Sequence, residues 1–486
     1  MSALFIALIV ILYGLASTLL LMYGLNAYLM IYYSSRSRRQ DLEKKRLQLE
    51  ADGQWPSVTV QLPIFNEQNV AERIIRAAAA LDYPRDRLEI QVLDDSTDQT
   101  VRIIDRVVDK VRSEGFDIKA VRRENREGYK AGSLANATGL ARGEFLAVFD
   151  ADFVPEADFL KHTVLPFMND EKVAFVQTRW GHLNCHENVL TRCQALGIDG
   201  HFLVEQPARS NAGLFMNFNG TAGMWRRKAI DEVGGWSAQT LTEDMDLSYR
   251  VQLAGWKPYY LGDVVVPAEV PATMAGAKSQ QFRWAKGSIQ TSILMLPKVW
   301  KGPFTRLQKI EAFLHLTNYG VHPMMLVLAL LAFPVLAFNL IKISPYFFAF
   351  IALPLFAATF GPSTMYMVAT FRNPKQKLTA LLWLPFLVIY GTGIAISNTI
   401  AIFEALIGKS SAFIRTPKKG EKNRSGYRLN RSYLWIFEIL LGLYSLGSIS
   451  AAIINENYVV VPFLSLFTLG FLTVGIRSAI GLTRDA

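Results

Sequence analysis

The order of apolar and polar residues divides this chain of 486 residues into three parts. Residues 2–33 are apolar and carry no charged side chain, and their number suffices for a helix that crosses a lipid bilayer. Residues 55–272 alternate short apolar runs with longer amphipathic ones, and from about residue 318 the chain is again mostly apolar. The pattern therefore predicts a membrane anchor, a polar domain and a multi-pass membrane region.

The polar domain alternates strand-like and helix-like segments. Short runs rich in β-branched and aromatic residues predict strands at 58–62, 89–93, 118–121, 145–149 and 173–178. Amphipathic stretches between them predict helices at 71–80, 100–113 and 131–140. This order predicts an α/β domain with a mostly parallel sheet and helices on both faces, and ligands of such sheets bind at the carboxyl ends of the strands.

Four long apolar stretches follow the polar domain, at 318–341, 345–371, 433–454 and 458–476. A further stretch, 378–408, is broken by Pro385 and Gly391-Thr392-Gly393. If it crossed the bilayer once, the basic loop 409–431 would lie outside, although basic loops normally stay in the cytosol. We therefore expect 378–408 to lie in the interface or to re-enter, which gives five crossings in total; six crossings are the alternative.

The formal net charge is +10, and the basic residues flank apolar segments instead of gathering with aromatic residues on one module. This favours the lipid bilayer over nucleic acid as a partner. Arg36, Arg38 and Arg39 follow the first apolar segment, so its N-terminus is expected outside and the polar domain in the cytosol. The two cysteines, Cys185 and Cys193, fit no zinc pattern and are expected to be reduced thiols.

These patterns divide the chain into seven segments. The expected segments are 1–33 as a transmembrane helix, 34–54 as a basic cytosolic linker, 55–272 as the α/β domain, 273–316 as amphipathic helices in the membrane interface, 317–371 as two transmembrane helices, 372–432 as interfacial or re-entrant helices with a basic loop, and 433–486 as two transmembrane helices and a short cytosolic tail. The α/β domain is thus expected to sit on the membrane surface through 273–316.

Two carboxylates one residue apart follow the predicted strand 145–149, as Asp150 and Asp152. Such a pair can hold one divalent cation and leave coordination positions for substrate phosphates. The alternative is a turn in which an aspartate side chain bonds to the backbone and Pro155 closes the segment. The neighbouring clusters of polar residues help to decide between them.

Polar residues also follow two other predicted strands, as Asn66-Glu67 and as Asp94-Asp95. A carboxylate at such a position can accept hydrogen bonds from a base or a ribose. Lys130 lies in a glycine-containing loop that leads into a helix, and backbone N–H groups there favour an anion such as a diphosphate. These residues predict a nucleotide site beside the carboxylate pair.

Residues 241–246 contain three acids in four positions ahead of a helix predicted at 247–253. A helix cap requires fewer acids, and a carboxylate here can act as general base on a hydroxyl nucleophile. Residues 280–284, on an amphipathic segment, are either interfacial anchors or a site where Trp stacks on a sugar ring and Arg pairs with phosphate. The basic loop 409–419 either binds anionic lipid or closes over a nucleotide diphosphate.

Taken together and in this order, the clusters resemble the D, DxD, TED and Q(Q/R)xRW motifs of processive family 2 glycosyltransferases, the cellulose and hyaluronan synthase class. The matching residues are Asp94-Asp95, Asp150-Ala151-Asp152, Thr242-Glu243-Asp244 and Gln280-Gln281-Phe282-Arg283-Trp284. The resemblance runs from about residue 55 to 420 and looks closest to the cellulose-synthase-like glucan and mannan synthases. It implies a GT-A (Rossmann-like) cytosolic domain beside an α-helical transmembrane bundle.

The resemblance also implies roles for single residues. Nucleotide binding is expected at Glu67, Asp94, Asp95, Lys130 and Asp150. Mg²⁺ or Mn²⁺ would be held by Asp150 and Asp152, and Asp244 would be the catalytic base. The acceptor end and the diphosphate would be held by Glu243, Gln280, Gln281, Arg283 and Trp284. A gating loop would contain Phe413, Thr416 and Lys418.

The function implied by the resemblance is an inverting, membrane-embedded enzyme that polymerises a β-linked glucan, mannan or glucomannan from UDP-glucose or GDP-mannose. A β-1,4 linkage is expected, and the nascent polysaccharide would cross the bilayer through the protein. The expected location is a bacterial inner or plasma membrane, with the Golgi membrane as the alternative. Two other functions remain open: a non-processive, glycolipid-forming membrane glycosyltransferase similar to glucosylceramide synthase, and a transporter with a nucleotide-sensing domain.

Overall fold

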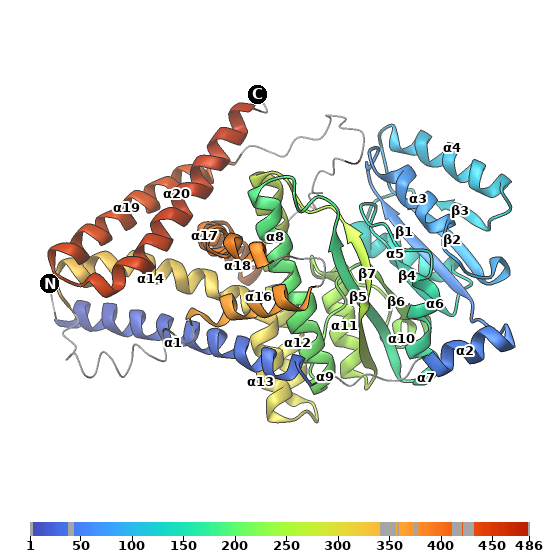
Figure 1. Cartoon of the computed structure of the whole chain (residues 1–486), viewed down its shortest axis with the longest axis horizontal. Helices are drawn as coiled ribbons and strands as arrows, with labels where there is room; N and C mark the ends of the chain where they lie inside the picture. Colours follow the sequence, from blue (N-terminus) through green and yellow to red (C-terminus); the bar gives the residue numbers. More distant parts are fainter. Residues whose placement is uncertain are drawn as a thin grey trace.

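The structure, a computed structural model, describes residues 3–36, 43–340, 356, 359–373, 378–410, 420 and 432–484. A seven-stranded sheet in this part of the chain has the order β3-β2-β1-β4-β6-β5-β7 (Figure 1). The strands are β1 Val58–Ile64, β2 Leu88–Asp94, β3 Ile118–Val121, β4 Phe145–Val148, β5 Val173–His182, β6 Gly223–Arg226 and β7 Lys257–Ala268. Only β6 runs antiparallel to its neighbours, so the other six strands end at the same edge.

Helices cover both faces of the sheet, as predicted. One face packs against α3 Ala71–Ala79, α4 Thr100–Ser113, α6 Phe159–Thr163 and α7 Leu165–Asn169, and the other against α5 Tyr129–Leu140, α10 Arg227–Glu232 and α11 Glu243–Leu253. The alternation of β4 explains this, because Phe145 and Ala147 belong to one core while Leu146 and Val148 belong to the other. Each such large apolar side chain contributes about 1.5–3 kcal/mol when it is buried.

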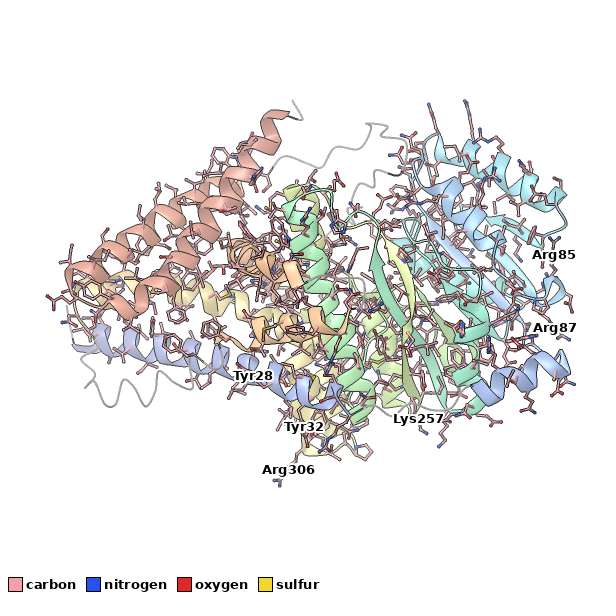
Figure 2. All side chains as sticks on the ribbon, in the orientation of Figure 1. Tyr28, Tyr32, Arg85, Arg87, Lys257 and Arg306 are labelled. Atoms are coloured by element: carbon pink, nitrogen blue, oxygen red, sulfur yellow. The ribbon has the colours of Figure 1, made fainter. Side chains whose placement is uncertain are left out.

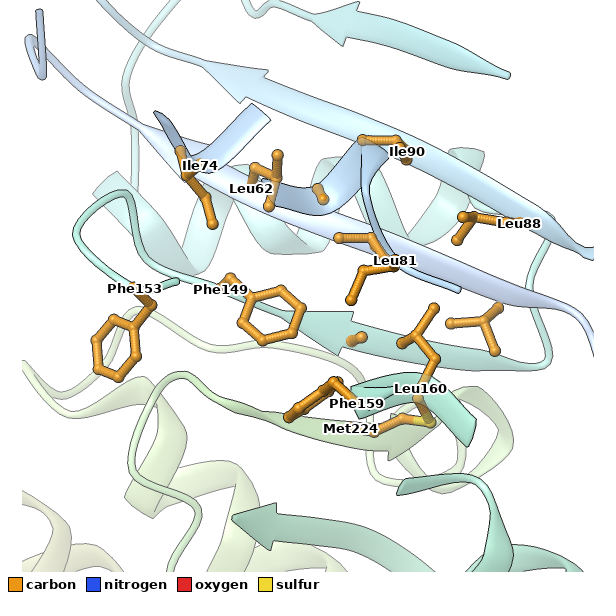
Figure 3. Packing of buried hydrophobic residues seen from close by; sticks show 14 of the residues in the cluster. Leu62, Ile74, Leu81, Leu88, Ile90, Phe149, Phe153, Phe159, Leu160 and Met224 are labelled. Carbon is orange, nitrogen blue, oxygen red and sulfur yellow. The ribbon is translucent and has the colours of Figure 1, made fainter. Parts of the chain in front are cut away.

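The core below the carboxyl edge is aromatic. Phe149 packs edge-on against Phe159, with ring centroids 4.8 Å apart, and Leu62 and Ile74 lie above them (Figure 3). This packing fixes the segment that leaves β4 and therefore the position of the two carboxylates that follow it.

A second group of helices lies between the sheet and the long apolar helices (Figure 1). It contains the continuous run of α8 Val189–Gly200, the π-helical turn η2 His201–Glu205 and α9 Gln206–Ala212, together with α12 Met274–Lys301 and α13 Arg306–Leu316. Shorter elements elsewhere are α2 Glu43–Asp52 and the 3-10 turn η1 Arg85–Arg87. Arg85 and Arg87 project at the end of the sheet domain that is far from α1, from which Tyr28 and Tyr32 project (Figure 2).

The apolar helices form the remaining part of the molecule. They are α1 Ala3–Ser34, η3 Asn318–Gly320, α14 Val321–Ala337, α16 Gly361–Arg372, η4 Leu378–Trp383, α17 Leu384–Gly393, α18 Ala395–Leu406, α19 Leu434–Ile454, η5 Tyr458–Val460 and α20 Val461–Arg484. Large apolar side chains point outward from them, with Leu4 82% and Ile454 78% exposed. Such a surface requires lipid around it, and the chain is a membrane protein.

Four helices in the described residues are long and apolar enough to cross a bilayer: Leu4–Ser34, Asn318–Ala337, Leu434–Ile454 and Tyr458–Gly481. The pair Leu378–Gly393 and Ala395–Leu406 is bent by 44°, so the break expected in this stretch is present. Of the predicted span 345–371, the structure describes mainly the part that forms α16. The number of crossings therefore stays a prediction.

α12 connects the two halves of the molecule. The Lys286 side chain is 0% exposed and pairs with Glu404 of α18 at 2.9 Å, and Lys278 pairs with Glu438 of α19 at 2.5 Å. Removing one partner of a buried pair leaves an uncompensated charge and costs about 3–5 kcal/mol. These pairs therefore hold α12 against the membrane helices.

The structure differs from several of the sequence-based predictions. β6 and β7 were not predicted. β6 has only four residues, and both strands are defined by pairing with strands that are distant in the sequence. β5 continues to His182 instead of ending at Thr178, since its last residues pair with β7. α11 begins at Glu243, so the acidic cluster forms its first turn instead of preceding it.

Candidate active site

One cavity lies at the carboxyl edge of the sheet and extends to α12. Ten of the predicted site residues line it: Glu67, Asp95, Lys130, Asp150, Asp152, Glu243, Asp244, Gln280, Arg283 and Trp284. They come from segments that are up to 217 positions apart, between Glu67 and Trp284. The fold thus brings all four motif clusters to one place, as expected for strand ends that share an edge.

Lys130 is the positive centre of this cavity. Its Nζ lies 2.5 Å from Oδ1 of Asp150, donates to the carbonyl oxygen of Gly220 at 2.8 Å and lies 3.9 Å from Oε1 of Glu243. Burial by itself lowers the pKa of Lys130, but Asp150 and Glu243 outweigh it and raise that pKa. The lysine is therefore a fixed cation beside the carboxylate pair.

Asp244 lies in the first turn of α11 beside Lys130. Burial, and secondarily the neighbouring Glu243, raise the pKa of Asp244 to about 7. Gly220 lies against it: a Cβ at that position would be 3.1 Å from Oδ2 of Asp244, and its φ of +79° also favours glycine. A carboxyl that is half ionised near neutral pH is suited to take up a proton.

α12 packs closely on the turn that carries Asp244. A Cβ at Gly287 would lie 2.5 Å from Cγ2 of Thr242, and the Thr242 and Thr291 hydroxyls are 3.2 Å apart. Oε1 of Gln290 accepts a hydrogen bond from the Leu241 backbone N–H at 2.9 Å. This contact determines how far the side chains of α12 are from the turn that carries Asp244.

Three predicted residues of α12 face the cavity together. Gln280, Arg283 and Trp284 are spaced at i, i+3 and i+4, so they share one side of the helix. Gln281 is on a different side, where its Oε1 accepts a hydrogen bond from the Tyr319 hydroxyl at 3.3 Å, and it does not line the cavity. The structure therefore brings Gln280 but not Gln281 to the site.

The two aspartates at the end of β2 have different environments. Asp94 is 3% exposed and does not line the cavity; its carboxylate accepts from Nε of Arg122 at 2.8 Å and from the Ser96 backbone N–H at 3.0 Å. Asp95 lines the cavity and accepts from Nε of Arg123 at 3.0 Å. Asp94 therefore braces the loops, and Asp95 is the member of the pair that can face a ligand.

Several cavity residues were not predicted. They include Arg126, whose guanidinium lies over the Phe65 ring with Cζ 3.3 Å from its centroid, and Trp180, His182, Asn219 and Glu269. Trp180 and His182 could have been found if the alternation of β5 had been followed past Thr178. The predicted loop residues Phe413, Thr416 and Lys418 lie outside the described residues.

The cavity carboxylates suit a metal ion that brings part of its ligand shell with it. Within the described ranges, no group of three or more His, Cys, Asp or Glu side chains could hold a metal ion by itself. Asp150 and Asp152 are close in sequence at the end of β4, and both line the cavity. Mg²⁺ commonly uses one or two carboxylates and completes its shell with substrate phosphates, so these donors fit an ion that arrives with a diphosphate.

Comparisons with known proteins agree with this geometry. The family model described as "Glycosyltransferase like family 2" matches residues 56–287. The glucomannan 4-beta-mannosyltransferase 2 of Arabidopsis thaliana is 36% identical over 372 residues, which cover 75% of this chain and 68% of that protein. Glucomannan 4-beta-mannosyltransferase 9 of the same plant is 33% identical, with 87% of this chain and 81% of that protein covered.

A probable glucomannan 4-beta-mannosyltransferase 11 of Oryza sativa subsp. japonica is 35% identical over 76% of this chain and 65% of that protein, so the chain spans about two thirds of this relative's length. Among solved structures, the mannosyltransferase PcManGT from Pyrobaculum calidifontis, in complex with GDP-Man and Mn²⁺, has a TM-score of 0.53. It is 22% identical, covers 82% of this chain and is covered completely, which supports the GT-A fold. The chain belongs to glycosyltransferase family 2, in its cellulose-synthase-like class of hexosyltransferases.

Proposed function

We propose that this chain is an inverting, processive synthase that polymerises a β-1,4-linked mannan or glucomannan from a nucleotide sugar and passes the polymer across the membrane. The observation that carries the proposal is the shared cavity of Asp150, Asp244 and Trp284, which come from three separate segments. The first suits a diphosphate site, the second a base and the third a sugar platform. Family membership limits the chemistry to sugar transfer.

Asp244 is the proposed general base. Its raised pKa of about 7 allows it to take the proton from an acceptor hydroxyl at neutral pH. The hydroxyl oxygen then attacks the anomeric carbon from the side opposite the diphosphate, the bond to the diphosphate breaks, and the configuration inverts in one step. No covalent intermediate on the protein is needed, so a single base is sufficient.

Lys130 and Arg283 are the proposed partners of the departing diphosphate. Both line the cavity, and both interact electrostatically with Glu243 and Asp150, which line the same cavity. Their positive charges are therefore placed where the diphosphate would bind. A Mg²⁺ or Mn²⁺ ion bound by Asp150 and Asp152 together with the phosphates would neutralise further charge on the leaving group. Asp95 is the proposed contact to the nucleoside, with Glu67 beside the same cavity.

Trp284 is the proposed platform for the acceptor end. A tryptophan face packs well on the apolar side of a sugar ring, and Gln280 on the same side of α12 can bond its hydroxyls. Since α12 is paired with α18 and α19, a chain end held here would lie next to the membrane helices. A polysaccharide needs protein around it to cross lipid, because its hydroxyls would otherwise lose their hydrogen bonds.

The relatives named above are mannosyltransferases of glucomannan, which favours a mannosyl donor such as GDP-mannose over UDP-glucose. The proposed topology has five crossings, with the N-terminus outside and the sheet domain in the cytosol. The proposed location is a bacterial inner or plasma membrane. The gating role of 413–418 is part of the same proposal.

The test uses the purified full-length protein in detergent or proteoliposomes. It is offered radiolabelled GDP-mannose or UDP-glucose with Mg²⁺ or Mn²⁺, and the product is digested with β-mannanase, β-glucanase or neither. A long product that only β-mannanase degrades is expected with GDP-mannose. Short products attached to lipid would instead establish a glycolipid-forming enzyme and refute the proposal.

A further inference from the structure

His182, the last residue of β5, is a cavity residue to which no role has been given above. Its side chain is 7% exposed, and its Nε2 lies 3.1 Å from Oδ1 of Asp199 in α8, which is 2% exposed. Oδ2 of Asp199 accepts a hydrogen bond from Nδ2 of Asn373 at 2.9 Å, at the end of α16. The buried carboxylate of Asp199 therefore fixes the orientation of the His182 imidazole through its Nε2.

The hydrogen bond also fixes where the proton is. A carboxylate only accepts, so Nε2 is the nitrogen that donates to Asp199, and Nδ1 is the ring nitrogen that can accept from a ligand. No hydrogen bond to Nδ1 is present within the described residues. The His182 side chain is more than nine-tenths buried and lines the cavity. The lone pair of its Nδ1 is therefore free for a ligand.

The position of His182 indicates which ligand this is. β2, with Asp95 at its end, and β5 are separated in the sheet by β1, β4 and β6. His182 is therefore on the side of the cavity away from the proposed nucleoside contact, together with Trp180, Ile198 and Val270. Asp199 and Asn373 connect it to α16 in the membrane part. Two apolar side chains and one tryptophan around a single acceptor nitrogen suit a sugar ring with one hydroxyl directed at that nitrogen.

We propose that Nδ1 of His182 accepts a hydrogen bond from a hydroxyl of the acceptor sugar chain, and that Asp199 is the positioning residue that keeps this nitrogen directed at the sugar. The inference rests on the proposed function, because it requires a sugar acceptor in this cavity. It adds a binding contact on β5 to the contacts of α12. The acceptor end is then held from two elements, which fixes both its place and its rotation.

Two substitutions separate the two nitrogens. In His182→Gln, the amide nitrogen keeps a donor for Asp199, but the acceptor at the Nδ1 position is lost. In His182→Asn, an amide oxygen replaces Nδ1, but the bond to Asp199 is lost. His162→Gln is the matched control, because the partly exposed His162 side chain on α6 pairs with the exposed Asp158 at the N-cap of that helix, and neither residue lines the cavity.

The experiment measures polymer formation and release of nucleoside diphosphate by the full-length protein, with the nucleotide sugar that the wild type uses. For His182→Gln we expect polymer formation to fall about fivefold to tenfold, the value of one hydrogen bond to a neutral group. More of the nucleotide sugar should be hydrolysed without transfer, while the Kd for the nucleoside diphosphate stays unchanged. His182→Asn should recover part of the transfer, and His162→Gln should match the wild type.

Wild-type transfer by His182→Gln would overturn the inference, since only the Asp199 contact would then matter. An equal loss of nucleotide binding would also overturn it, because it would show a general role in the fold. If the wild type transfers no sugar from any nucleotide sugar, the proposed function itself fails, and the inference fails with it. The three results are distinct in the same set of measurements.

Discussion

Replacing Asp244 with asparagine removes the proposed base and keeps the shape of the side chain. The variant should therefore lose sugar transfer but keep nucleotide binding. Positioned general bases contribute about 10²–10⁴-fold to the rate, so a loss in this range is expected in kcat. For the wild type, the pKa of about 7 implies a rate that rises about tenfold between pH 6 and pH 8, as the ionised fraction grows.

The raised pKa of Asp244 also affects stability, and the effect of pH on stability is opposite to its effect on the transfer rate. The pKa of Asp244 is about 7 in the folded protein and 3.8 as the ordinary value, a difference of about 3.2. Between these values the unfolded chain is ionised while the folded protein is still protonated, so stability falls as the pH rises. Asparagine avoids this cost, and its advantage should grow from about 2 kcal/mol at pH 5 to about 4 kcal/mol at pH 8.

The assay compares the melting temperature and the transfer rate of both proteins at pH 5 and pH 8. Asp86→Asn is the control, because the Asp86 side chain is 77% exposed and should alter neither quantity. The expected result is a variant that is less active and, at pH 8, more stable. Full activity in Asp244→Asn would refute the assignment of the base, and a difference in melting temperature that does not depend on pH would refute the burial argument.

Three further predictions concern the neighbouring residues. Gly220→Ala should reduce transfer at least tenfold, because its Cβ would press on the Asp244 carboxylate, whereas Gly234→Ala, with a φ of +84° and open space around it, should cost only stability, as measured by thermal melting. Gln280→Ala should raise the KM for acceptor several-fold while Gln281→Ala changes it less than twofold, since only Gln280 lines the cavity; the reverse order would show that the helix faces are assigned wrongly. Removal of divalent cations with EDTA should abolish transfer, and Asp150→Asn should raise the Mn²⁺ concentration required for half-maximal transfer; activity in EDTA would exclude the metal proposal.

The sequence was most informative where a chemical motif coincides with a regular element. Asp150 was found because a buried strand ends just before it, and the i, i+3, i+4 spacing of Gln280, Arg283 and Trp284 already places them on one side of a helix. The exclusion of Gln281 follows from the same spacing, but the motif match included it. Motif membership is therefore a weaker guide than helical phase.

Contacts between distant segments could not be predicted in the same way. Asp94 is withdrawn from the cavity by Arg122, and the ring of His182 is oriented by Asp199 from another helix. Both are side-chain contacts that depend on the packed fold. The sequence contains the partners but not the signal that they meet, so the division between bracing and binding residues required the structure.

The close packing of Gly287 on Thr242 has a consequence for how the product grows. Since α12 is also joined to α18 and α19 by buried ion pairs, the proposed point of sugar addition is held at a constant distance from these membrane helices. In the proposed processive reaction, the polymer would have to advance by one sugar unit after each addition, because the packing of α12 prevents the active site from following the new end. The fixed position of α12 would therefore set the length of each step of the polymer to one sugar unit.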